Sequence, residues 1–168
     1  MAEGKSDPFV DTCTFCSIAN NQDEETEVIL KDKEMVCFRD IDPAAPHHYL
    51  VIPRRHIVSC LSLDRGHRRL IERMAEMGRA VLREQGIIDM KDVRLGFHQP
   101  PYISVNHLHL HVLAPASQIS EYMIYKFIPG TSSFITLCVR LVVLRADRGH
   151  AQMFGVSVSQ TRLAEISP

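Results

Sequence analysis

The run His107-Leu108-His109-Leu110-His111-Val112-Leu113 alternates imidazole rings with aliphatic side chains. Strict alternation with a period of two is typical of a β-strand, in which successive side chains point to opposite faces of the sheet. We therefore expect a strand over residues 107–114. The histidines should share one face, and the aliphatic residues between them should pack into the core behind. Same-face neighbours lie roughly 6.5–7 Å apart on a strand, so several imidazoles can surround one small ligand.

On the residues alone, three interpretations of this histidine run are open. The histidines can lie on a solvated strand face without any chemical role. They can also form the three-histidine set of a catalytic zinc ion. In the third interpretation, the central ring is a nucleophile toward phosphorus and its neighbours contact the phosphate. Imidazole suits that role because much of it is neutral near pH 7.

The composition limits the classes of protein that need to be considered. A chain of 168 residues with 45% hydrophobic and 23% charged residues is expected to form one soluble domain. Its net charge of −1 argues against nucleic-acid binding through bulk electrostatics. A single nucleotide is compatible with that charge, because histidines and backbone N–H groups can hold a phosphate.

The sequence contains no segment typical of export or membrane insertion. The N-terminus lacks the apolar region of a signal peptide. The longest apolar stretch, residues 134–144, is too short to span a bilayer and contains Arg140. We therefore expect a cytoplasmic protein that can also enter the nucleus, with no membrane partner. The five cysteines, an odd number without an export signal, argue against a disulfide framework.

Local patterns predict the order of the structural elements. Residues 1–11 resemble a disordered leader, and a short helix should follow from Cys13. Residues 64–86 show apolar positions at helical spacing, with Asp64 suited to the N-cap and Gly86 to the stop. The strand-like runs cover residues 28–31, 35–39, 49–52, 93–99 and 107–114.

Three separate motifs in this chain resemble those of the histidine triad family. H-L-H-L-H-V-L is similar to the family's His-x-His-x-His motif followed by two apolar residues. F-R-D-I-D-P-A-A-P-H-H-Y-L-V-I-P-R-R-H-I, residues 38–57, resembles its other signature. V-R-L-G-F-H-Q-P-P-Y-I-S-V-N-H, residues 93–107, resembles the histidine triad nucleotide-binding protein 3 branch and, less closely, aprataxin. The resemblance implies an α+β fold, a five-stranded antiparallel sheet with helices packed on it, over a histidine triad domain at residues 12–120.

The resemblance also implies a role for individual residues. His109 matches the nucleophile that becomes transiently adenylylated, His111 matches a phosphate contact, and Ser104 matches a serine near the leaving group. The implied substrate contacts are Asp40 and Ile41 at the ribose, together with His48, His98 and Leu110. At His98 other members carry an asparagine, so the hydrogen-bond donors offered to the substrate differ here.

The implied activity is hydrolysis of purine nucleotide substrates, AMP phosphoramidates or acyl-AMP, to AMP through a covalent adenylyl-histidine. No cofactor is expected to be required for catalysis. The family forms dimers that extend the sheet, so we expect a homodimer or larger homo-oligomer. Two alternatives remain: aprataxin-like removal of AMP from nucleic-acid ends, which the neutral charge disfavours, and a non-catalytic nucleotide-sensing scaffold.

The pair Cys13 and Cys16 has the C-x₂-C spacing of structural zinc sites. In family members that keep this cysteine pair, two histidines complete the zinc site. The resemblance implies that His56 and His107 are those two ligands here. A structural zinc is therefore one expectation, and two ordinary core cysteines on a short helix are the other.

The segment from 121 to 168 departs from the family pattern. The branch's tryptophan is absent, and the chain contains no tryptophan. We expect this atypical tail to pack poorly.

Overall fold

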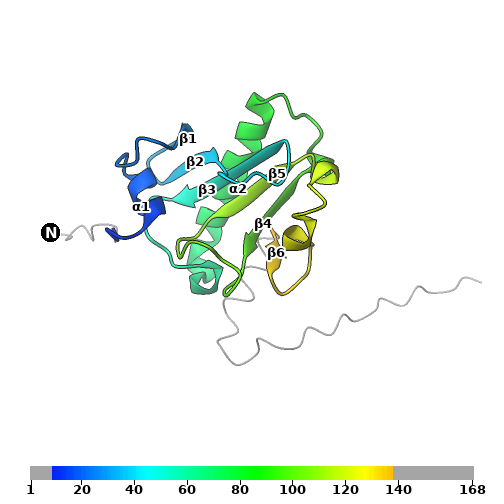
Figure 1. The fold of residues 1–168 in the computed structure, drawn as a ribbon. Helices are drawn as coiled ribbons and strands as arrows, with labels where there is room; N and C mark the ends of the chain where they lie inside the picture. The colour runs from blue at the N-terminus through cyan, green and yellow to red at the C-terminus, as the bar shows by residue number, and fades with distance from the viewer. Residues whose placement is uncertain (1–8, 138–168) are drawn as a thin grey trace, which may run out of the picture.

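The computed structural model describes residues 9–137, which are built around a six-stranded sheet (Figure 1). All neighbouring strands are antiparallel, in the order β1-β2-β3-β5-β4-β6. The α+β class is confirmed, but the sheet has six strands instead of the expected five. The strands are β1 (Val28–Lys31), β2 (Met35–Arg39), β3 (His47–Pro53), β4 (Arg94–His98), β5 (Leu110–Ala114) and β6 (Phe134–Thr136).

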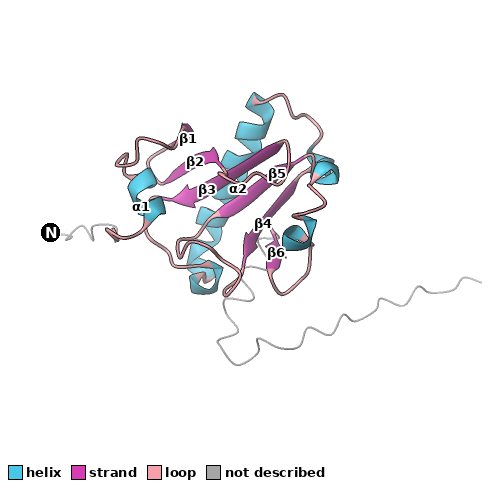
Figure 2. Cartoon of the chain, viewed as in Figure 1, coloured by secondary structure: helices cyan, strands magenta, loops and turns pink. Residues whose placement is uncertain are grey.

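The long helix α2 (Arg68–Glu84) covers one face of the sheet and α1 (Thr14–Ala19) lies against the other (Figure 2). The apolar face of α2 packs on β2, β3 and β5 in the main core. Asp64 caps a short 3₁₀ turn at Arg65–His67, from which α2 continues. Gly86 ends the helix with a φ of 85°, a conformation that glycine adopts without steric cost. Further 3₁₀ turns lie at Cys60–Ser62, Met90–Asp92, Ala116–Gln118 and Ile124–Phe127.

Strand β5 begins at Leu110, three residues later than the alternation predicts. The ladder with β3 runs from the Ala114–His47 pair to the Leu110–Val51 pair and stops there. Before it, the N–H of Leu108 donates to the carbonyl of Ile57, 2.6 Å away, so this residue bonds to a loop. Residues 107–109 therefore lie outside the strand, and the loop that contains Ile57 holds this segment.

The first part of the expected tail packs closely, contrary to expectation. Phe127 and Phe134 are buried, and β6 pairs with β4 through Gly96–Thr136 and His98–Phe134. A Cβ atom at Gly96 would lie 2.4 Å from the Phe134 ring, so only glycine allows this approach. β6 thereby covers the edge of β4 and provides the sixth strand.

Residues 1–8 and 138–168 lie outside the described part, and with them most of the expected leader and tail, including Cys138. Val10, at the end of that expected leader, is partly buried against the small core around α1. Within residues 9–137, no helix combines the length and apolar character needed to cross a membrane.

Candidate active site

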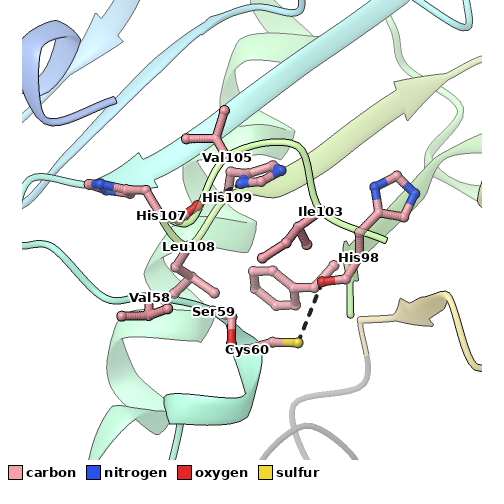
Figure 3. Close-up of a pocket in the computed structure, with 10 residues that line it drawn as sticks. Val58, Ser59, Cys60, His98, Ile103, Val105, His107, Leu108 and His109 are labelled. Atoms are coloured by element: carbon pink, nitrogen blue, oxygen red, sulfur yellow. Dashed lines mark hydrogen bonds between the residues drawn. The ribbon is translucent and has the colours of Figure 1, made fainter. Parts of the chain in front are cut away.

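The central histidine of the triad is held in one tautomer by the backbone. His109 Nδ1 lies 2.6 Å from the carbonyl oxygen of His107, and a carbonyl can only accept. The neutral ring therefore carries its proton on Nδ1 and leaves a lone pair on Nε2. The side chain is 7% exposed, next to a small pocket whose walls include Ser59, Ile103 and Val105 (Figure 3). His109 thus offers a neutral nitrogen nucleophile beside this pocket.

A chain of three groups sets the tautomer of His111. The N–H of Ala44 donates to His48 Nδ1 at 2.9 Å, so the proton of neutral His48 lies on Nε2. That Nε2 is 2.9 Å from His111 Nδ1, to which it donates. The remaining proton of His111 lies on its Nε2, which is buried and has no partner in the described residues. An unpaired buried donor is costly unless something completes its hydrogen bond, and a phosphate oxygen is such an acceptor.

Asp40 lies at the edge of this histidine chain. Its Oδ2 is 3.3 Å from His48 Nε2 and 3.8 Å from His111 Nδ1, while its Oδ1 accepts from the N–H of Asp42 at 2.9 Å. Burial raises the pKa of this carboxyl above its ordinary value of 3.8. The neighbouring Ile41 is fully exposed. An acidic and an apolar side chain therefore lie next to each other at the rim of the histidine site.

His98 closes the site on the other side of His111, where the ring centroids are 4.5 Å apart. Its Nε2–H donates to the carbonyl of Lys126 at 2.8 Å, which leaves Nδ1 as an acceptor. Phe127 packs its ring edge-on or tilted against His48, His98 and His111, at centroid distances of 5.0–5.4 Å. The wall formed by Lys126 and Phe127 was missed from the sequence, because it belongs to the segment that departs from the family. The sequence feature that could have predicted this wall is the aromatic and apolar content of residues 122–128.

Two predicted site residues lie away from this histidine face. Leu110 is fully buried in the main core beneath the sheet, so its side chain cannot contact a substrate, which corrects that expectation. The reason is the strand alternation itself, because Leu110 points opposite to its histidine neighbours. Ser104 is exposed on the loop before the triad, and its role toward a leaving group stays a prediction.

Burial controls the charge of the whole histidine group. It lowers the pKa of His109, His111 and His98 below the ordinary 6.5, and that of His48 to about 4. The positive charges of neighbouring histidines, when protonated, act in the same direction. The site is therefore a set of neutral imidazoles at pH 7, as a nitrogen nucleophile requires.

We predict that the lowered pKa of His109 moves the acid limb of kcat/KM below pH 6.5. The nucleophile must be neutral, so activity falls only when the pH drops through the lowered pKa. The measurement is kcat/KM for an AMP-amine phosphoramidate from pH 8 downward, with the enzyme-free hydrolysis rate subtracted at each pH. An acid limb centred above pH 6.5 contradicts the prediction.

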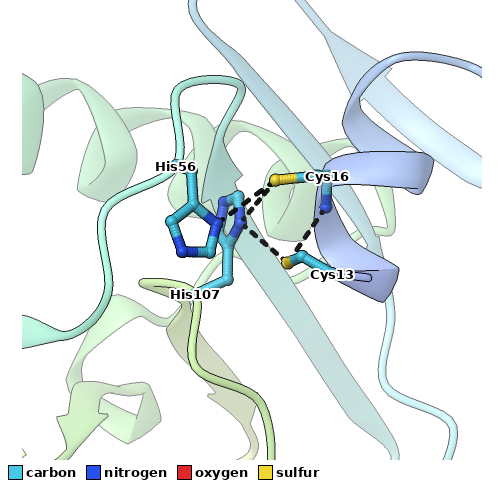
Figure 4. Close-up of side chains that lie close together, drawn as sticks. All are labelled: Cys13, Cys16, His56 and His107. Atoms are coloured by element: carbon cyan, nitrogen blue, oxygen red, sulfur yellow. Dashed lines mark hydrogen bonds between the residues drawn. The ribbon is translucent and has the colours of Figure 1, made fainter. Parts of the chain in front are cut away.

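A second cluster joins Cys13 and Cys16 of the α1 region to His56 and His107 (Figure 4). The sulfur-to-nitrogen distances are 3.4 Å for Cys13 to His107, 3.6 Å for Cys16 to His107, and 3.2 Å for Cys16 to His56, each to Nδ1. Tetrahedral zinc with ordinary bond lengths holds sulfur and nitrogen roughly 3.5 Å apart. His107 Nε2–H donates to the carbonyl of Pro53 at 2.8 Å, which turns Nδ1 toward the sulfurs. The four residues therefore fit a closed zinc site.

Asp40, His48 and His111 also lie close enough together to suggest a metal. Here the hydrogen bonds argue against one, because the Ala44 N–H occupies His48 Nδ1 and leaves the proton on Nε2. A protonated nitrogen cannot ligate, so this group is a hydrogen-bonded part of the active site.

Comparison with known proteins identifies the class. A family model described as "Scavenger mRNA decapping enzyme C-term binding" matches residues 12–124. The solved structure titled "HIT family hydrolase from Clostridium thermocellum Cth-393" superposes with a TM-score of 0.57 at 27% identity, covering 62% of this chain and 90% of that one. With its triad and its sheet, the chain belongs to the histidine triad family.

Within this family, the chain is similar to proteins named adenosine 5'-monophosphoramidase HINT3. The protein of that name from Danio rerio is 59% identical over 116 residues, covering 69% of this chain and 72% of the relative. The one from Xenopus tropicalis is 49% identical over 117 residues, covering 68% and 76%. The resemblance seen in the sequence motifs is confirmed.

Proposed function

We propose that this chain is a nucleotide phosphoramidate hydrolase that releases AMP from adenosine 5'-phosphoramidates and acts also on aminoacyl-adenylates. The names of its relatives supply the substrate class. The observation that carries the proposal is the paired tautomers of the triad. One neutral nitrogen with a free lone pair, on His109, neighbours one buried N–H, on His111, that has no partner among residues 9–137. A nucleophile beside an unpaired donor suits attack at an anionic phosphorus centre.

In the first step, His109 Nε2 attacks the α-phosphorus and the bond from phosphorus to the leaving nitrogen breaks. The ring becomes positively charged, and the carbonyl of His107 stabilises it through the Nδ1–H bond. His111 Nε2–H stabilises the phosphoryl oxygens, where negative charge develops. The departing amine takes up a proton, for which the Ser104 hydroxyl is the proposed relay.

In the second step, water attacks the adenylyl-histidine, the bond between phosphorus and His109 breaks, and the ring leaves in its neutral form. The attacking water releases one proton, which replaces the proton that the departing amine took up, so the enzyme returns to its starting state. Asp40 is proposed to accept hydrogen bonds from the ribose hydroxyls, with Ile41 and His98 as further contacts with the nucleotide. No divalent cation needs to contact the phosphate in this scheme, because the imidazoles and the backbone supply the electrostatic stabilisation.

The test supplies two adenylylated compounds to the same preparation: an AMP-amine phosphoramidate and a DNA oligonucleotide capped with AMP. We expect rapid release of AMP from the first and slow release from the second, because the chain has a net charge of −1 and therefore no overall electrostatic attraction to a nucleic acid. Faster release from the DNA supports the aprataxin-like alternative. Tight AMP binding with no turnover of either compound supports the nucleotide-sensing scaffold.

We also propose that Cys13, Cys16, His56 and His107 hold a structural zinc. With four protein ligands, the ion has no open position for water or substrate, so it cannot act as a Lewis acid on the phosphate. When bound, it would join α1 to the segment that carries the nucleophile. Only His109 and His111 of the triad would then face the phosphate.

Metal analysis should find about one zinc per chain. The double change Cys13→Ser and Cys16→Ser should remove the zinc and lower the melting temperature more than it lowers turnover at a temperature where the variant is folded. Cys37→Ser is the control, since it changes a cysteine of the main core that is not one of the four ligands, and this variant should keep its zinc. The proposal is wrong if the wild-type chain contains no metal and the double change leaves its stability unaltered. Both cysteines would then be ordinary core residues.

A further inference from the structure

The pair Cys13 and Cys16 can also react without a metal. Cys13 is the N-cap of α1, and the N–H of Cys16 donates to its sulfur at 3.4 Å. Both sulfurs approach the same atom, His107 Nδ1, and all ligand atoms of the cluster lie within 4.8 Å of one another. A C-x₂-C pair at the first turn of a helix has the spacing of reactive dithiols. The geometry therefore favours a bond between these two sulfurs.

Closing that bond needs only a small local movement. Residues three apart on a helix have Cβ atoms about 5–6 Å apart, whereas a disulfide needs about 3.5–4.5 Å. Cys13 has an extended backbone, with φ −91° and ψ 114°, and lies outside the helical turn. Its rotation can bring the sulfurs together without unwinding the six-residue helix.

His107 connects this pair to the nucleophile. Its side chain is completely buried, and its Nε2–H is engaged by the carbonyl of Pro53, so Nδ1 can only accept. In the reduced, metal-free chain, the thiols of the pair are the hydrogen-bond donors to Nδ1 of His107. The carbonyl of the same residue holds the Nδ1–H of His109. A change at the sulfurs therefore acts two hydrogen bonds away from the attacking nitrogen.

We propose that Cys13 and Cys16 form a reversible redox pair, and that their oxidation to a disulfide lowers turnover by releasing His107. With hydrogen peroxide as the oxidant, the sulfur of Cys13 attacks one oxygen, the O–O bond breaks, and a sulfenic acid and water form. The sulfur of Cys16 then attacks the sulfenic sulfur and a second water leaves. The two sulfurs lose two electrons and two protons in total, and the peroxide is reduced to two water molecules.

The disulfide has no S–H group to donate to His107 Nδ1. Both sulfurs are consumed, so the oxidised pair also cannot act as the thiolate ligands of a metal. Cys37 and Cys60 lie in the main core, outside the cluster that holds the sulfurs of Cys13 and Cys16 within 4.8 Å of each other. We therefore expect the disulfide to form at the pair.

The chemical arm of the test uses the full chain carrying Cys138→Ser, stripped of metal by a chelator and treated with hydrogen peroxide. Mass spectrometry of the alkylated and digested protein should find one disulfide, between Cys13 and Cys16, which dithiothreitol reduces. Prior addition of zinc should slow its formation. Alkylation of both cysteines after treatment, or their conversion to sulfinic acids without a linkage, overturns the proposal. This arm does not depend on the proposed function.

The activity arm depends on the proposed function, and uses the same samples. Oxidised protein should lose at least about threefold in kcat for the AMP-amine phosphoramidate, and the reductant should restore it. Peroxide treatment should leave the turnover of the Cys13→Ser variant at its value before treatment. The Cys37→Ser variant should lose turnover as the parent does. A disulfide that leaves kcat unchanged overturns the link to His109. Absence of turnover in the reduced parent instead contradicts the proposed function, and the linkage result stands by itself.

Discussion

His109→Ala should lower kcat for an AMP-amine phosphoramidate by about 10³-fold or more, the scale expected when a covalent nucleophile is removed. In the first step of the proposed scheme, the ring supplies the atom that bonds to phosphorus. Its Nδ1 is fixed by the carbonyl of His107, so Nε2 faces the substrate already deprotonated. His111 cannot take over this role, because it presents a proton at the nitrogen that faces the site.

Two measurements test this prediction. Rapid acid quench of the wild-type reaction should trap one AMP on the peptide that contains His109, and the variant should show no such adduct. His47→Ala is the matched control, since this histidine contacts Tyr49 at the start of the inner strand β3, and the variant should retain turnover. Turnover close to wild type in His109→Ala would exclude the covalent mechanism and favour a binding role.

His111→Ala should lower kcat by about 10²–10³-fold, the usual loss when one preorganised donor to a developing oxyanion is removed. The N–H that the reaction would use is on Nε2, because His48 occupies Nδ1. KM should change much less than kcat, because the charge on the phosphoryl oxygens grows in the transition state.

Two conservative variants separate the donor from the ring. His111→Gln places an amide N–H near the position of Nε2, whereas His111→Asn places it near Nδ1, facing His48. We expect the glutamine variant to be the more active of the two. Equal activities, or a better asparagine variant, would contradict the assigned tautomer. Thermal melting of both variants checks that each one is folded before the rates are compared.

The elements that arise from local periodicity could be predicted from the sequence. The alternation at residues 107–113 predicted β5 and the face to which its histidines point, apart from the start at Leu110. The apolar spacing at residues 64–86 predicted α2, with Gly86 at its end. These predictions succeed because a strand and an amphipathic helix show their periods directly in the chain. Most of the candidate site residues also came from the sequence, through motifs in the chain.

Other parts of the site depend on contacts between distant segments, and these contacts could be seen only in the folded chain. The proton positions on His109 and His111 depend on a carbonyl and on Ala44, and neither bond has a sequence pattern. The resemblance named Cys13, Cys16, His56 and His107 in advance, but their sulfur-to-nitrogen distances are set by folding across 40 to 94 residues of chain.

The wall formed by Lys126 and Phe127 shows the same limit. It comes from a segment that matched no motif, and β6 holds that segment at the edge of β4. A local pattern reports the period and polarity of a segment, but hydrogen-bond partners are chosen by the packing of segments that the chain brings together only on folding.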